Sequence, residues 1–175
     1  MNDAPWSTTP GQFLAEPSGF VRAMRPSASP LVYPEDMIFG RGNCGLLAMA
    51  ICSGRSLAET TQWFRYYGNL RGTPKTNSQG RAFKGNWKGT TFHVTYSQYL
   101  NSKWVRHTHM QHLGNATVNR FANEYARPGV LYAIRFTGHV MTLKDGFLCD
   151  QKQNCRVELH RYRKMMVTNT WEILV

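Results

Sequence analysis

Residues 41–54 of this chain read Arg41-Gly42-Asn43-Cys44-Gly45-Leu46-Leu47-Ala48-Met49-Ala50-Ile51-Cys52-Ser53-Gly54. A glycine-rich loop is followed by an apolar, mostly helix-favouring run, which predicts a buried helix over residues 44–53. Asn43 is a favourable N-cap residue, because its side-chain oxygen can accept a hydrogen bond from the first turn of a helix. Gly54 is a favourable residue to end this helix. We therefore expect Cys44 at the N-terminus of a buried helix.

This position of Cys44 has two interpretations. Free N–H groups and the helix dipole favour negative charge at a helix N-terminus, which lowers the pKa of a thiol and makes it a nucleophile. The alternative is that Cys44 is a small packed hydrophobic residue, as many free cysteines are. A second stretch of sequence favours the first interpretation.

A meander of short strands is predicted over residues 127–150. Residues 130–136 follow a Pro-Gly pair and predict one strand, residues 139–143 predict a second, and residues 147–150 predict a third. Asp145-Gly146 is a strong signal for a two-residue hairpin turn between the last two strands. The hairpin register therefore follows from the sequence.

This register brings His139 and Asp150 together. With Asp145 and Gly146 at the centre of the turn, Asp150 faces Met141 and becomes the diagonal neighbour of His139, roughly 7–8 Å away between backbones. A carboxylate beside an imidazole fixes its tautomer and stabilises the imidazolium, which is the orienting role in a nucleophile–base–acid triad. The alternative is an exposed histidine and a solvated acid in a turn.

The two stretches together resemble the papain-like cysteine peptidase superfamily. In that superfamily a cysteine at the start of a helix precedes a Gly-His on a strand and an Asp or Asn one strand later, and the matching residues here are Cys44, His139 and Asp150. The Gly-Asn-Cys-Gly run is also similar to the nucleophile motif of ovarian-tumour deubiquitinases, with Arg41 where that class usually carries Asp. The papain subgroup usually carries a Gln before the cysteine, and no Gln lies between Gln12 and Cys44. The strand arrangement looks closer to bacterial and viral papain-like peptidases.

The resemblance implies a thiol hydrolase that cleaves peptide or isopeptide bonds without a metal or cofactor. Cys44 would be the nucleophile, His139 the base and Asp150 its orienting acid. The oxyanion hole would combine the backbone N–H of Cys44 with a second donor, for which Asn43 and a neighbouring loop amide are the candidates. The expected partner is a protein or peptide substrate, with acidic and ubiquitin-like substrates both open. Viral, phage, effector and deubiquitinase-like roles are open as well.

The order of the elements predicts an α+β fold of papain-like type, with the nucleophile helix packed against an antiparallel sheet. The length fits one domain. We expect an extended N-terminal arm over residues 1–34, which is rich in Pro, Ser and Thr, and a catalytic domain over residues 35–175. No apolar run is long enough for a membrane span, no signal-peptide pattern opens the chain, and four cysteines do not make a disulfide framework. These features predict a cytoplasmic protein, in the host cytoplasm if it is viral, with no membrane partner.

Several further elements are predicted from local signals. A capping box, Ser56 to Glu59, predicts a helix to about Tyr67, and Glu35-Asp36 before the cysteine loop is expected to cap a helix or to be solvated. Asn115 or Thr117 is expected to cap a helix that ends before Pro128. Strands are expected at four places, which are residues 90–96, 103–106, 157–159 and 170–175.

The formal net charge of +11 supports a second hypothesis, a basic nucleic-acid-binding module without catalytic activity. Residues 69–89 are polar, basic and glycine-rich, which predicts a long loop. Phe83, Lys84 and Trp87 alternate aromatic and basic character within it, a pattern that suits a substrate or single-stranded nucleic acid. A mobile surface loop is the simpler interpretation.

A third hypothesis is a zinc protein. His107, His109 and His112 form a His-x-His-x-x-His cluster, and Cys149 or Cys155 would complete the ligand set. Surface histidines at a strand end and inert thiols are the simpler interpretation, although the two cysteines are also close enough in sequence to pair as a disulfide.

Overall fold

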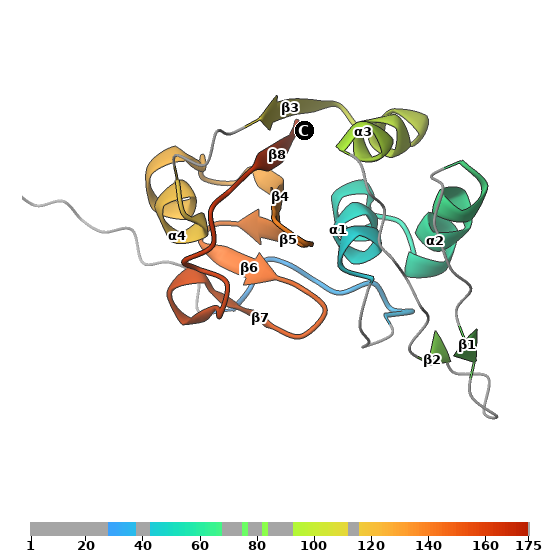
Figure 1. Ribbon diagram of the computed structural model, residues 1–175, viewed down its shortest axis with the longest axis horizontal. Helices are drawn as coiled ribbons and strands as arrows, with labels where there is room; N and C mark the ends of the chain where they lie inside the picture. Colours follow the sequence, from blue (N-terminus) through green and yellow to red (C-terminus); the bar gives the residue numbers. More distant parts are fainter. Residues whose placement is uncertain are drawn as a thin grey trace, which may run out of the picture.

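A six-stranded antiparallel sheet in the order β3-β8-β4-β5-β6-β7 forms the centre of the computed structural model (Figure 1). The structure describes residues 28–37, 43–67, 75–76, 82–83, 93–111 and 116–174, and for 75–76, 82–83 and 93–94 the backbone only. The strands of the sheet are β3 (His107–Gln111), β4 (Leu131–Phe136), β5 (His139–Lys144), β6 (Phe147–Cys149), β7 (Asn154–Arg156) and β8 (Asn169–Ile173). A separate small sheet pairs β1 (Lys75–Thr76) with β2 (Ala82–Phe83).

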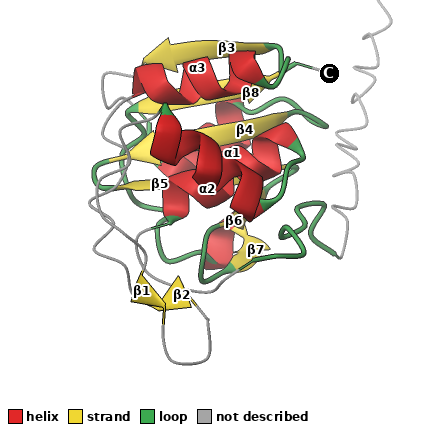
Figure 2. Cartoon of the chain, turned by 90° about the vertical axis from the view of Figure 1, so that its right-hand side faces the viewer, coloured by secondary structure: helices red, strands yellow, loops and turns green. Residues whose placement is uncertain are grey.

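Helices cover both faces of the large sheet, and the predicted α+β class is confirmed. The helices α1 (Cys44–Ser53), α2 (Leu57–Tyr66) and α3 (His93–Ser102) lie on the face seen in Figure 2. The short helix α4 (Val118–Arg120), which continues into the π-helical turn η1 (Phe121–Tyr125), lies on the other side (Figure 1). A 3-10 turn, η2 (Val157–Leu159), packs near α4. No helix in these described ranges is long and apolar enough to cross a membrane.

Each face of the sheet has its own hydrophobic core. The core under α1, α2 and α3 includes Met49, Phe64, Tyr99 and Trp171. The core on the side of α4 is built from Phe121, Ile134, Met141, Leu143 and Leu148, among others. Burying a large apolar side chain stabilises a fold by about 1.5–3 kcal/mol, so the two cores fix the sheet between its helix layers.

The helix α1 begins at Cys44 and ends at Gly54, as the sequence predicts. Gly54 has a φ of 63°, which glycine adopts without strain, and its N–H bonds back to the last turn. The Asn43 carbonyl accepts from the Leu47 N–H at 2.9 Å, which starts the helical ladder. The prediction that the Asn43 side chain caps the helix is wrong, because this side chain makes no capping hydrogen bond and the backbone is not extended there.

The helix α2 is capped from two directions. Ser56 accepts a hydrogen bond from the Glu59 N–H at 3.1 Å, which confirms the predicted N-terminus. The Asp36 carboxylate accepts from the N–H groups of Leu57 and Ala58 at 2.8 and 2.7 Å, so its predicted capping role is confirmed too. At the other end of α2, Tyr67 is 72% exposed.

The strand predicted over residues 90–96 is wrong, because α3 begins at His93. Tyr96, Tyr99 and Leu100 are buried at helical spacing against α1 and α2, and this packing outweighs the β-propensity of the segment. The strand predicted over residues 103–106 is a helix-ending turn in which Trp104 has a φ of 58°, and β3 starts afterwards.

The strand predicted over residues 157–159 is also wrong, because this segment is the 3-10 turn η2. The apolar residues alternate in sequence, but Val157 is buried while Leu159 is exposed, so they do not share a face. The predicted C-terminal strand is confirmed as β8, which lies between β3 and β4. The predicted helix before Pro128 is confirmed as α4 and η1, with Thr117 as its cap.

The hairpin at Asp145-Gly146 forms as the sequence predicts. Both residues have positive φ, at 49° and 77°, as a type I′ turn requires. The observed register pairs Thr142 with Cys149 and Leu143 with Leu148, which is the predicted register.

The described part of the predicted N-terminal arm, residues 28–34, contains no helix or strand and contacts residues of β6 and β7. Leu31 is buried with Phe147 and Cys149, and its carbonyl accepts from the Asn154 side chain at 2.7 Å. Tyr33 donates its hydroxyl to the Asp150 carbonyl at 2.8 Å. Residues 1–27 lie outside the described residues. Through these contacts, residues 28–34 pack against β6 and β7 next to Asp150.

Candidate active site

Three elements meet where the sequence predicts a triad. The helix α1 starts at Cys44 and packs against β5, which starts at His139. The strand β6 ends immediately before Asp150. Gly138 makes the preceding turn possible, since its φ of 77° favours glycine, and this turn places His139 at the first position of its strand.

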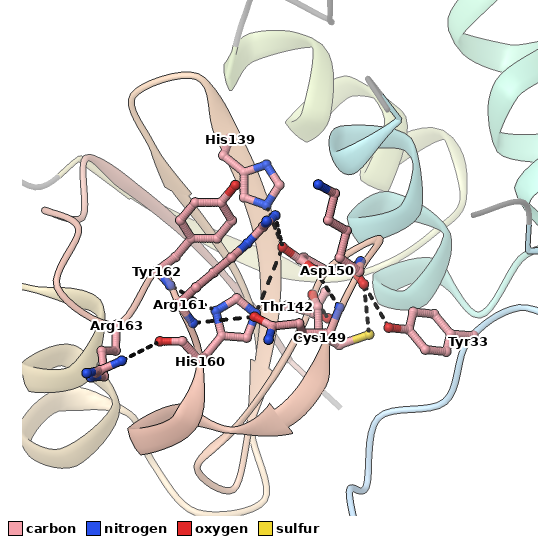
Figure 3. A network of polar contacts seen from close by, with 11 residues as sticks. Tyr33, His139, Thr142, Cys149, Asp150, His160, Arg161, Tyr162 and Arg163 are labelled. Carbon is pink, nitrogen blue, oxygen red and sulfur yellow. Dashed lines mark hydrogen bonds and ion pairs between the residues drawn. The ribbon is translucent and has the colours of Figure 1, made fainter. Parts of the chain in front are cut away.

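The imidazole of His139 contacts the Asp150 carboxylate. The distance from His139 Nε2 to Asp150 Oδ2 is 3.1 Å (Figure 3). Both side chains are buried, with exposed fractions of 9% and 1%. Because Nε2 faces Asp150, Nδ1 is the ring nitrogen left for another partner. The predicted proximity of His139 and Asp150 follows from the hairpin register.

The Asp150 carboxylate is held in its charged form. Its other oxygen, Oδ1, accepts from the backbone N–H groups of Lys152 and Gln153 at 2.7 and 2.8 Å. Burial alone would raise the pKa of Asp150, but the hydrogen bond from His139 and the two backbone N–H groups hold that pKa well below its usual range. The site therefore keeps a buried negative charge beside His139.

The His139 imidazole and the backbone N–H groups of Val140 and Gly45 all act to favour the thiolate form of Cys44. Burial acts to raise the pKa of Cys44, but these contacts outweigh it and lower the pKa. For His139, burial acts to lower the pKa, whereas Asp150 and Cys44 raise it to about 9. The lowered pKa of Cys44 and the raised pKa of His139 both favour a thiolate–imidazolium pair at neutral pH.

The other three cysteines, all within the described residues, have the opposite environment. Burial raises the pKa of the Cys52 thiol and raises that of Cys149 to about 11. The pKa of Cys155 is raised as well, again by burial first. Cys44 is therefore the one thiol of the four that is poised to ionise. Cys149 and Cys155 are free thiols and do not form a disulfide.

A cluster of residues that sequence reasoning missed surrounds the carboxylate and the imidazole. The Tyr162 ring lies 4.6 Å from that of His139, and the Arg161 guanidinium lies 4.3 Å from the Tyr162 ring. Arg161 and the buried His160 both approach Asp150 Oδ2, at 3.5 and 3.9 Å (Figure 3). The run from residue 161 to 164 predicts only a solvated basic segment, and no sequence signal separates its site-facing residues.

The described residues do not test the other predicted site residues. Asn43 directly precedes Cys44, but its predicted oxyanion role has no contact here that tests it. Phe83 belongs to β2, where only the backbone is described, while Lys84 and Trp87 lie outside the described residues. They remain predictions for substrate or nucleic acid.

The predicted histidine cluster is only partly described. His109 stacks on Trp171, His107 Nδ1 lies 3.1 Å from the Val105 carbonyl, and His112 lies outside the described residues. Within the described ranges, no group of three or more His, Cys, Asp or Glu side chains is arranged to hold a metal ion.

Comparison of the chain with protein-family models, with curated proteins and with solved structures finds no match. The site combines the Cys44 thiol, the His139 imidazole and the Asp150 carboxylate, with the imidazole in contact with the carboxylate and raising the thiolate character of Cys44. Such an arrangement can generate a thiolate, donate a proton to a leaving group and activate water.

Proposed function

We propose that this protein is a papain-like cysteine peptidase, a thiol hydrolase that cleaves peptide or isopeptide bonds. The observation that carries the proposal is the position of His139, whose Nε2 contacts the Asp150 carboxylate and whose imidazole lowers the pKa of the Cys44 thiol. Support also comes from the chain order of the three residues and from a nucleophile helix that packs on an antiparallel sheet.

In the first half of the reaction, the Cys44 thiolate attacks the substrate carbonyl carbon and forms a tetrahedral intermediate. The His139 imidazolium then donates its proton to the leaving amine, and a thioester remains on Cys44. Asp150 stabilises the imidazolium and holds its orientation. The pKa of His139, raised to about 9, suits a group that must carry this proton at neutral pH.

In the second half, neutral His139 removes a proton from water, which attacks the thioester and releases the carboxylic acid and the Cys44 thiol. The developing oxyanion requires nearby N–H donors. The backbone N–H of Cys44 is suited to this role, because the first N–H groups of a helix have no partner within the helix. Asn43, next to it, is the candidate for a second donor.

The alternative hypothesis, a basic nucleic-acid-binding module, has most of its predicted aromatic and basic loop outside the described residues. Of the two hypotheses, only the peptidase accounts for the shifted pKa values of Cys44, His139 and Asp150. Perturbed pKa values of this kind cluster at functional sites.

Cleavage of a peptide library derived from a proteome tests the proposal. New N-termini would be identified by mass spectrometry for the parent protein, Cys44→Ala and Cys155→Ala. We expect cleavage by the parent and by Cys155→Ala, and none by Cys44→Ala. The matched control removes a half-buried thiol whose pKa is raised. Cleavage that persists in Cys44→Ala, or its absence in the parent, would contradict the proposal.

A further inference from the structure

Three side chains crowd one oxygen of the Asp150 carboxylate. Oδ2 lies 3.1 Å from His139 Nε2, 3.5 Å from Arg161 Nη2 and 3.9 Å from His160 Nε2 (Figure 3). The two backbone N–H groups fix Oδ1, so the carboxylate can still pivot about that oxygen. The surroundings of Oδ2 therefore decide whether it points to His139.

The tautomer of His160 is set by its backbone neighbour. The Tyr162 N–H donates to His160 Nδ1 at 3.2 Å, and a nitrogen that accepts a hydrogen bond carries no proton. The proton of the neutral ring is therefore on Nε2, the nitrogen that faces Asp150. At 3.9 Å this contact is longer than a hydrogen bond, and it acts through the N–H dipole.

The charge state of His160 is set by its burial. The ring is fully buried, and burial lowers its pKa. Asp150 acts against this effect, whereas the charges of Arg161 and His139 add to it. Burial, Arg161 and His139 outweigh Asp150, and the neutral form of His160 is favoured. His160 therefore directs an N–H dipole at Oδ2 without competing for the positive charge of His139.

Arg161 competes with His139 for the Asp150 carboxylate. Its guanidinium is charged, is closer to Oδ2 than His160 is, and is more than a third exposed, at 37%. It reaches Oδ2 from the solvent side, stacked on Tyr162, whereas His160 approaches from within the protein. A carboxylate that turned toward Arg161 would form a stronger charge pair but would leave His139.

We propose that His160 is a positioning residue that holds Asp150 Oδ2 on His139 against the pull of Arg161. The inference rests on the proposed function, because it concerns how the imidazole of the same site is kept oriented. Without the Nε2 donor, Oδ2 turns toward Arg161. His139 then loses its carboxylate partner, and Cys44 loses thiolate.

The test measures the rate at which iodoacetamide alkylates Cys44 at about pH 6, below the ordinary thiol pKa. His160→Asn keeps an oxygen that can accept from the Tyr162 N–H but removes the donor to Asp150. His160→Gln can place an amide N–H where Nε2 was. We expect His160→Asn to react about three- to tenfold more slowly than the parent, because an N–H dipole beyond hydrogen-bond distance contributes less than a hydrogen bond to a charged group. His160→Gln should keep most of the parent rate.

A double variant tests the opposition directly. Adding Arg161→Gln to His160→Asn removes the competing charge, and we expect it to restore most of the lost rate. Equal rates in His160→Asn and the parent, or no restoration in the double variant, would overturn the inference. If the parent Cys44 reacts no faster than Cys155, the proposed function fails instead, so the two failures are distinguishable.

A second measurement needs no substitution and therefore does not depend on how the variants fold. Nitrogen-15 NMR of the histidine rings in the parent should show His160 neutral, with its proton on Nε2, at about pH 7 and above. A proton on Nδ1, or a titration of His160 near neutral pH, would overturn the inference.

Discussion

The pKa of Cys44 results from two opposing influences. Burial disfavours the thiolate, while the contact with His139, its positive charge and the N–H groups of Val140 and Gly45 favour it. The second group prevails, so the net effect lowers the pKa of Cys44. Cys52, eight residues later in the same helix, experiences burial without such contacts, and its pKa is raised. The microenvironment, rather than the residue type, makes the nucleophile.

Asp150→Asn should lower the pKa of His139 from about 9 toward or below its ordinary value. The variant keeps the shape of the side chain but removes the charge that stabilises the imidazolium, and burial then dominates. The pKa can be measured by NMR titration of the ring. Asp145→Asn makes the same chemical change in the turn of the same hairpin and should leave the His139 pKa near its parent value. An unchanged pKa in Asp150→Asn would contradict this assignment.

The pairing of His139 with Asp150 was predictable from sequence, because a two-residue turn fixes the register of the few residues on either side of it. The approach of Cys44 to His139 was expected only through a family resemblance, since no local rule relates residues so far apart in the chain. His160 and Arg161 were missed because they follow a 3-10 turn, which has no regular side-chain period to indicate a shared face.

Among the elements, the turn between β4 and β5 places the imidazole. Gly138→Ala should destabilise the protein by about 1–2 kcal/mol, because its φ of 77° is strained for any L side chain. It should also slow alkylation of Cys44, because His139 is the next residue. Gly129→Ala is a matched control, with a φ of 76° and open space around its Cβ. We expect a similar loss of stability there with no change at Cys44, measured by denaturant unfolding and alkylation. Equal effects of both variants on Cys44 would contradict this role.

The Asp36 cap joins the N-terminal segment to α2. Asp36→Ala should reduce the free energy of unfolding by about 1–2 kcal/mol, because two N–H groups of the first turn lose their acceptor. Glu35→Ala, one residue earlier and exposed, should change it by no more than about 0.5 kcal/mol. Denaturant unfolding measures both values, and equal losses would contradict the capping role.

Element type was predictable where a cap or a turn accompanied the pattern, as in α1, α2 and the Asp145-Gly146 hairpin. It was not predictable for α3, whose β-branched and aromatic residues favour a strand locally. Burial of Tyr96 and Tyr99 against neighbouring helices decides that segment, and such packing is not visible in a local window. The segment from Val157 to Leu159 was mispredicted for the same reason, because its alternation of apolar and polar residues does not show which of them are buried.

For the whole molecule, the buried charge of Asp150 makes stability depend on pH. Its pKa is lower in the folded than in the unfolded protein, so its stabilising contribution is fully present above the unfolded value of about 3.9. The contribution is lost as the pH falls toward the folded pKa. Unfolding measured between about pH 5 and about pH 2 should therefore show a steeper loss of stability for the parent than for Asp150→Asn. Parallel curves would contradict the assignment.

The site also joins parts of the molecule that are distant in sequence. The segment of residues 28–36 supports Asp150 through Tyr33 and caps α2 through Asp36, while α1 carries Cys44 to β5. The α+β class was predictable from the order of elements. The position of β8 between β3 and β4 was not, because long-range strand order leaves no local signal.

The most direct test of the thiolate–imidazolium pair is the alkylation rate of all four cysteines by iodoacetamide, resolved by mass spectrometry from about pH 5 to about pH 9. The parent and His139→Ala would be compared. We predict that Cys44 in the parent reacts much faster than Cys52, Cys149 and Cys155 on the acid side of neutral, and that this advantage disappears in His139→Ala. If Cys44 reacts no faster than the other three, or keeps its advantage without His139, the pair does not exist and the proposed peptidase mechanism is wrong.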